Sequence, residues 1–65
     1  MNIFVNGSIE NIDEMTVLEF IIFRGLSPDK LVIEHNENIL KKEYWESTIL
    51  KSDDALEIIS FVGGG

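Results

Sequence analysis

The fold is decided by the stretch Ala55-Leu56-Glu57-Ile58-Ile59-Ser60-Phe61-Val62, which runs directly into Gly63-Gly64-Gly65. Its near-continuous apolar character predicts a long strand in the middle of a sheet, because a strand covered on both sides has few polar positions. The three glycines that follow have no side chains and wide backbone freedom, so they cannot continue the strand as a packed element.

The two faces of this strand follow from its alternation, since successive side chains point to opposite sides. One face, which we expect to pack on the core, carries Leu56, Ile58, Ser60 and Val62. The other carries Ile59 and Phe61, which we expect on the outer face of the sheet just before the glycines. Exposed apolar side chains there favour a surface on which a partner protein docks. Alternatively, Ile59 and Phe61 are covered by another part of the domain or by a second copy of the chain.

The first half of the chain predicts a hairpin followed by one helix. Met1, Ile3 and Val5 alternate with Asn2, Phe4 and Asn6, which predicts a strand with one apolar face. Asn6-Gly7 is a strong signal for a tight hairpin turn. The returning strand is expected over residues 8–12, with Ile9 and Ile12 as its apolar positions.

The helix is predicted from Val17 to Arg24. Thr16 and Glu19 have the spacing of a capping box at its start, and Gly25 stands where a C-terminal cap belongs. Its expected buried face carries Val17, Phe20 and Ile21. Because the other helix positions Leu18, Ile22 and Phe23 are also apolar, the sequence does not indicate which side of the helix is exposed.

The second half predicts short elements before the last strand. Strands are expected at 31–35 and 39–40, and a helical turn within 41–48 with Tyr44 and Trp45 as apolar anchors. Lys41-Lys42 is expected to be a solvated basic pair, and residues 52–54 a turn.

This element order is typical of the β-grasp, or ubiquitin-like, arrangement. That α+β fold has a mixed sheet of four to five strands with one main helix packed across it. The last strand would lie centrally, parallel to the first. We expect residues 1–62 to form one domain and residues 63–65 a flexible tail.

Composition excludes several classes of protein. A chain of 65 residues holds one core. It has no cysteine, and therefore no disulfide and no thiolate metal site. The net charge of −7 disfavours nucleic acid and anionic membranes as partners and favours a basic docking face. Because no leader or run of about 20 apolar residues is recognisable, we expect a cytoplasmic protein.

The residues of common catalytic sites are missing. A Ser–His–Asp triad would need His35, which we expect to be a surface turn histidine. A metal site of His35 with Glu34 and Glu37 is rejected, since neighbouring strand residues point to opposite faces. Asp53 and Asp54 are expected to be solvated turn residues. We therefore predict no catalytic residue, no metal and no bound cofactor.

The terminal glycines point to a different chemistry. A thread without side chains can enter a narrow active-site channel and deliver the carboxylate of Gly65. A carboxylate needs a leaving group such as adenylate before sulfur or an amine can attack it. The chain has no phosphate-binding loop, so a separate ATP-using enzyme would activate it. A frayed terminus is the alternative.

Several stretches together resemble the sulfur carrier proteins of thiamine biosynthesis, the ThiS family. They are Thr16-Val17, Glu34-x-Asn36-x-x-Ile39, Trp45-x-x-Thr48-x-Leu50 and residues 56–65, of which the closing Phe-Val-Gly-Gly-Gly is the most specific. The family commonly has an Asp-Gly-Asp-like turn where this chain has Ser52-Asp53-Asp54. Aspartate tolerates the left-handed conformation that such a turn requires.

The resemblance implies a carrier that partner enzymes act on and that is not an enzyme itself. A ubiquitin-activating-like adenylyltransferase would use ATP and Mg²⁺ to adenylate Gly65, and a sulfur donor enzyme would supply the sulfur of a thiocarboxylate. Thiazole synthase would then take the sulfur. The implied partner-binding residues are Ile59, Phe61, Val62, Gly63 and Gly64.

Three other functions fit the same fold, because function resides in the partners. The small subunit of molybdopterin synthase also resembles this chain, although it is typically longer. A ubiquitin-like modifier would form isopeptide bonds through Gly65. A plain interaction module would carry an incidental tail.

Overall fold

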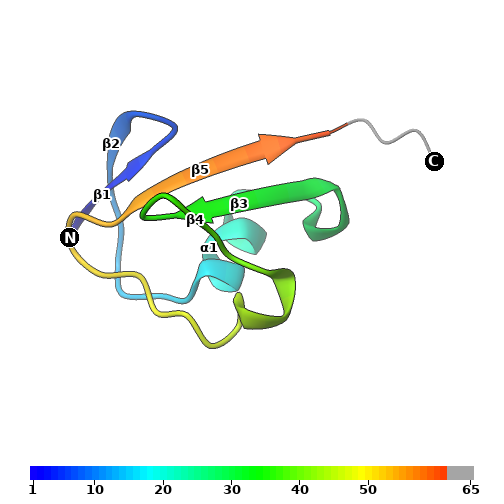
Figure 1. Ribbon diagram of the computed structural model, residues 1–65. Helices are drawn as coiled ribbons and strands as arrows, with labels where there is room; N and C mark the ends of the chain where they lie inside the picture. The colour runs from blue at the N-terminus through cyan, green and yellow to red at the C-terminus, as the bar shows by residue number, and fades with distance from the viewer. Residues whose placement is uncertain (62–65) are drawn as a thin grey trace.

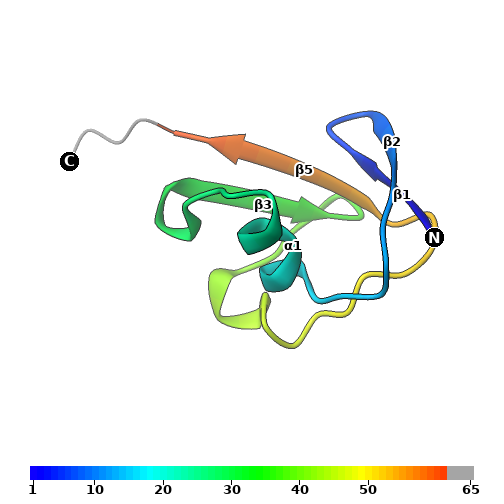
Figure 2. The same ribbon diagram turned by 180° about the vertical axis from the view of Figure 1, so that it is seen from behind.

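The computed structural model describes residues 1–61, which form five strands, one α-helix and two 3₁₀ helices (Figure 1). In chain order these are β1 (Asn2–Val5), β2 (Ser8–Asn11), α1 (Val17–Phe23), η1 (Pro28–Lys30), β3 (Leu31–His35), β4 (Asn38–Ile39), η2 (Lys42–Tyr44) and β5 (Ala55–Ser60). The strands make one mixed sheet in the order β2-β1-β5-β3-β4. Strand β5 is central, parallel to β1 and antiparallel to β3. The predicted α+β fold, with five strands and one helix across the sheet, is confirmed (Figure 2).

The first hairpin closes on the predicted Asn6-Gly7 turn. Both residues have positive φ, 50° and 84°, as a tight two-residue turn requires. Strand β2 ends one residue earlier than predicted. Of the two apolar residues of the predicted strand, Ile12 is buried, whereas Ile9 lies opposite Phe4 and is largely exposed. Residues that are paired across two strands share a face, and here that face points away from the helix.

Side-chain and backbone caps fix the ends of helix α1. The Thr16 hydroxyl accepts from the Glu19 N–H at 3.1 Å, and the Glu19 carboxylate accepts from the Thr16 N–H at 2.8 Å. At the other end Gly25 has φ of 71°, and the N–H groups of Gly25 and Leu26 donate to Ile22 and Ile21 carbonyls. This is a Schellman cap, which needs a left-handed residue at that position. The predicted capping box and glycine stop are confirmed.

The core lies between α1 and the inner face of the sheet. The predicted helix face of Val17, Phe20 and Ile21 is buried there. Trp45 is also buried, and its indole N–H donates to the Leu40 carbonyl at 2.8 Å. Tyr44 is 52% exposed, so its predicted anchoring role is wrong. Neighbouring residues of a 3₁₀ turn point in different directions, and only one of the two aromatic rings reaches the core.

Strand β5 follows the predicted alternation but is shorter at its end. Leu56 is buried and Ile58 partly buried against the core. Ser60 is the last strand residue and is exposed, so its predicted packing on the core is wrong, because the core contacts of this strand end at Ile58. Phe61 follows the strand, so its predicted place within the strand is also wrong. The predicted extension to Val62 and the tail of residues 63–65 lie outside the described residues. Within residues 1–61, no helix is long and apolar enough to cross a membrane.

Candidate functional site

An apolar patch lies on the outer face of the sheet at the end of β5. Ile59 is 50% and Phe61 46% exposed, which confirms the predicted exposure of both residues. Val32 on β3 stands directly opposite Ile59 in the strand register and is partly exposed. Helix α1 packs on the opposite face of the sheet (Figure 2). We call Val32, Ile59 and Phe61 the exit patch, because they lie where strand β5 ends.

A backbone hydrogen bond fixes Phe61, the exit-patch residue that lies just beyond the end of β5. The N–H of Phe61 donates to the Lys30 carbonyl of η1 at 3.0 Å. The ladder between β3 and β5 therefore continues for one residue past Ser60, and the sheet sets the position of Phe61. The described part of the chain therefore ends, at Phe61, within an exposed apolar surface.

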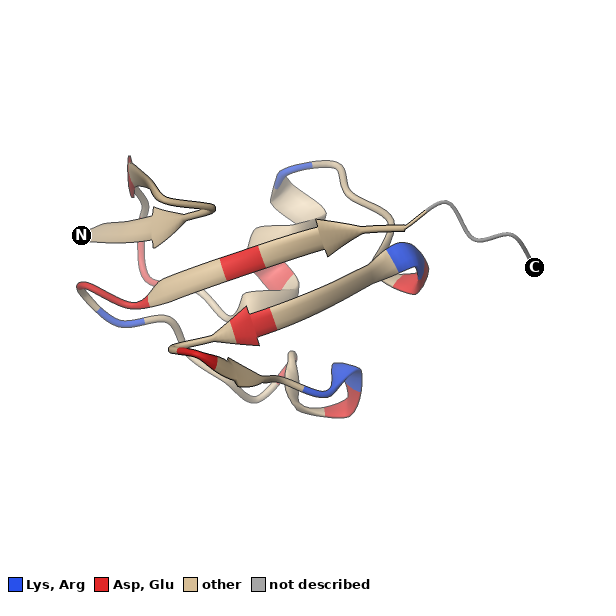
Figure 3. Cartoon of the chain, turned by 45° about the horizontal axis from the view of Figure 1, so that its top comes forward, with Lys and Arg blue, Asp and Glu red and all other residues tan. Residues whose placement is uncertain are grey.

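Two carboxylates lie next to the exit patch on the same face. Glu34 on β3 is directly opposite Glu57 on β5, two residues from the Val32–Ile59 pair. Figure 3 shows the two acidic bands side by side on these strands. Glu57 is exposed and Glu34 half-buried. Among residues 1–61 neither carboxylate has an ion-pair partner.

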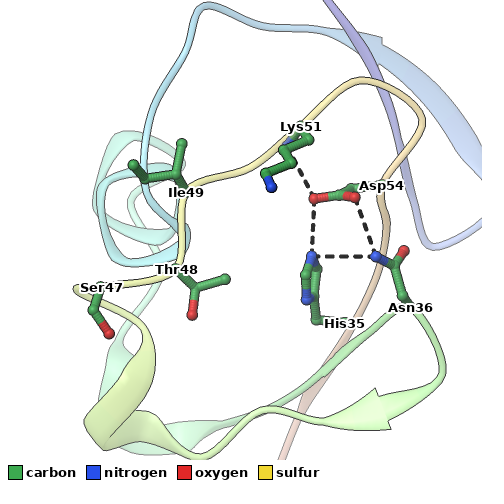
Figure 4. Close-up of a pocket in the computed structure, with 7 residues that line it drawn as sticks. All are labelled: His35, Asn36, Ser47, Thr48, Ile49, Lys51 and Asp54. Carbon is green, nitrogen blue, oxygen red and sulfur yellow. Dashed lines mark hydrogen bonds and ion pairs between the residues drawn. The ribbon is translucent and has the colours of Figure 1, made fainter.

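A second polar cluster lies at the opposite end of β5 (Figure 4). His35 Nε2 is 2.9 Å from Asp54 Oδ2, and Asn36 Nδ2 donates to Asp54 Oδ1 at 3.1 Å. The N–H of Lys51 donates to the same carboxylate at 2.9 Å. Asp54 is 9% exposed, so the prediction of a solvated turn residue is wrong for it. His35 is half-buried and paired, which also corrects its prediction as a surface turn histidine.

The electrostatics of this cluster depend on the charge of Asp54. Burial raises the pKa of Asp54, but the hydrogen bonds from His35, Asn36 and the Lys51 N–H outweigh it, so the pKa lies below its usual value. An ionised carboxylate only accepts, so His35 Nε2 carries the proton in this bond. The 3.5 Å approach of Asn36 Nδ2 to His35 Nε2 is then a contact between two donors.

Within residues 1–61, the cluster links β3 to the turn before β5 through Asp54 and lacks the hydroxyl contact of a hydrolytic triad. It borders an open pocket of about 510 Å³, across which Ser47 and Thr48 lie (Figure 4). The hydroxyls of Ser47 and Thr48 donate to the Tyr44 carbonyl. Within residues 1–61, therefore, no hydroxyl is hydrogen-bonded to His35 as a nucleophile would be.

Sequence reasoning found only part of this arrangement. The structure joins the predicted Ile59 and Phe61 to Val32, which the alternation of residues 31–35 could have placed on the same face. The Glu34–Glu57 pair depends on the register between β3 and β5, for which the sequence carries no local signal. The predicted partner-binding residues Val62, Gly63 and Gly64 and the carrier residue Gly65 lie outside the described residues. In the described part of the chain, no three His, Asp or Glu side chains cluster as a metal would require.

Comparison with known proteins decides the family. The family profile of ThiS matches residues 2–65. The chain belongs to the ThiS family. The crystal structure of the thiamine biosynthesis protein ThiS from Geobacter metallireducens superposes with a TM-score of 0.86 at 30% identity, covering 100% of both chains. The ThiS β-grasp fold is thereby confirmed.

Relatives of this ThiS family member occur alone and within longer proteins. The uncharacterized protein ycf40 of Porphyra purpurea is 32% identical over 66 residues, which cover 100% of this chain and 93% of the relative. A thiazole synthase of Magnetococcus marinus is also 32% identical over 66 residues. The chain spans only 20% of the length of that thiazole synthase.

Proposed function

We propose that this chain is a sulfur carrier of thiamine biosynthesis whose working group is the carboxylate of Gly65. The observation that carries the proposal is its membership of the ThiS family over residues 2–65, a match that includes the terminal glycines. The likeness to the Geobacter metallireducens thiamine biosynthesis protein supports thiamine over molybdopterin as the product of the pathway. In this role the chain is a cosubstrate in the cytoplasm and performs no catalysis of its own.

The proposed chemistry has two steps on Gly65. Its carboxylate oxygen attacks the α-phosphorus of ATP in a partner adenylyltransferase, Mg²⁺ neutralises the phosphate charge, and pyrophosphate leaves. A sulfur nucleophile at the oxidation level of sulfide, provided by a sulfur donor enzyme, then attacks the acyl carbon and displaces AMP. The product is a thiocarboxylate at the chain end.

We propose that thiazole synthase accepts the sulfur in the step that forms the thiazole ring. Two thiazole synthases, from Magnetococcus marinus and Paramagnetospirillum magneticum, match this chain over 20% of their length. A carrier-like segment within a synthase supports a direct hand-over between the two. The exit patch supports this role because exposed apolar residues that directly precede the tail in the chain can dock on a partner and direct the tail into it.

An adenylation assay tests the proposal. The adenylyltransferase from the same source, with Mg-ATP and labelled pyrophosphate, should exchange label into ATP only when this chain is present. Deleting Gly65 should abolish the exchange, because the reacting carboxylate then lies one residue short of the active site. Equal exchange with the deleted chain would contradict the assignment of Gly65.

A further inference from the structure

We propose that the Glu34–Glu57 pair is the polar centre of the docking surface and receives a basic side chain, preferably arginine, from the partner protein. This rests on the proposed function, because the partner is the adenylyltransferase into which the tail would be inserted. The surface consists of the exit patch together with the two carboxylates and Ile39, which stands opposite Glu34 on β4. All of these residues lie on the sheet face away from α1.

The pairing of the two glutamates destabilises the free protein. Like charges directly opposite each other on neighbouring strands repel, since their Cβ atoms are about 5 Å apart. The three ion pairs within residues 1–61 join Arg24 to Glu10, Lys42 to Asp29 and His35 to Asp54, and none reaches this face. An acidic pair that the fold itself leaves unneutralised is therefore available to a cation from outside.

The surroundings of the pair favour a protein side chain over a metal ion. Ca²⁺ takes about six to eight oxygen ligands, more than two carboxylates supply, and no third acidic or histidine side chain joins them in the described residues. On one side lie Val32 and Ile59 and on another Ile39, all exposed apolar residues. A partner that covered these residues would exclude water and strengthen an ion pair at the centre. The planar guanidinium of arginine has donors enough for both carboxylates at once.

The same charges exclude a second copy of this chain as the occupant. In a symmetric dimer each patch meets its own copy, so four glutamates would converge without a cation. The net charge of −7 opposes self-association further. The surface is therefore suited to a basic partner of another kind.

Neutral substitutions test the proposal against a matched control. Glu34→Gln with Glu57→Gln keeps both shapes and raises the net charge by two. Glu43→Gln with Glu46→Gln makes the same charge change at exposed positions outside the surface. Binding of each variant to the adenylyltransferase is measured by calorimetry at low and high salt, and the unfolding midpoint in urea is measured alongside.

The Glu34/Glu57 variant should bind at least about tenfold more weakly than the wild type and lose most of its salt dependence. It should also unfold at a higher urea concentration, because the repulsion is gone. The Glu43/Glu46 variant should bind within about twofold of the wild type. If the wild type binds and is adenylated but the two double variants bind equally well, the proposal about Glu34 and Glu57 is overturned and the proposed function stands. Failure of the wild type to be adenylated would instead overturn the proposed function.

Discussion

Asp53 and Asp54 are neighbours of the same type that occupy opposite environments. Asp53 takes the left-handed conformation, with φ of 70°, and remains exposed. Asp54 turns inward and accepts hydrogen bonds from His35, Asn36 and the Lys51 backbone. The sequence signals a turn here but not which aspartate is buried, since the partners of Asp54 stand up to 19 positions away along the chain.

Substituting Asp54→Asn should lower the free energy of unfolding at pH 7 by about 2 kcal/mol, because hydrogen bonds to an ionised carboxylate are lost and an amide donor faces other donors. The folded-state pKa of Asp54 lies below its usual value of 3.8. Its contribution is thus complete above that value and is lost as the pH falls through the folded-state pKa. Urea unfolding measured between pH 7 and pH 2 should show a smaller acid dependence in the variant.

Asp53→Asn is the control, because asparagine also tolerates positive φ and Asp53 is exposed. It should change stability by no more than about 0.5 kcal/mol. An Asp54→Asn protein as stable as the Asp53→Asn protein would show that the cluster does not brace this turn.

Part of the backbone of strand β5 is hydrogen-bonded to the side chain of Asn6 in place of a neighbouring strand. Strand β1 stops at Val5, and the Asn6 side chain takes over: its Oδ1 accepts from the Ile58 N–H at 2.7 Å and its Nδ2 donates to the Ile58 carbonyl at 3.3 Å. One residue therefore makes the hairpin turn and also continues the ladder toward the exit patch.

Asn6→Gly separates these two roles, because glycine keeps the positive φ but has no side chain. We expect a loss of about 1–2 kcal/mol in stability and faster hydrogen exchange at the Ile58 amide. Asn6→Asp retains the acceptor for Ile58 and should preserve its protection better. Unchanged exchange at Ile58 in the glycine variant would contradict this role.

The elements that sequence predicted are those with local signals. The Asn6-Gly7 turn, the Thr16–Glu19 capping box and the apolar run of β5 each lie within a few residues, and each is confirmed. The errors at Ser60 and Tyr44 concern whether a side chain at the edge of the fold reaches the core. Such positions depend on strand pairing and on the direction of a short turn, which only tertiary packing decides.

Across the whole molecule, the His35–Asp54 cluster and the exit patch lie toward opposite ends of β5. Asp54 directly precedes this strand and Phe61 directly follows it, so these two residues stand about 23 Å apart at strand geometry. On β3, His35 of the cluster and Val32 of the exit patch are about 10 Å apart and point to opposite faces of the sheet. Helix α1 occupies the inner face, and the outer face of the sheet carries the exposed residues of the exit patch. Asp54→Asn should therefore weaken the fold but leave adenylation of the folded protein intact.

The central claim is that Gly65 carries sulfur, and the intact mass of the protein tests it most directly. The chain is incubated with the adenylyltransferase, Mg-ATP and a sulfur donor, and a Gly65 deletion is treated alongside. We predict a mass gain equal to the difference between one sulfur and one oxygen atom, present in the full chain and absent in the deletion. An unchanged mass, in a reaction where the same enzyme sulfurates another carrier, would contradict the account.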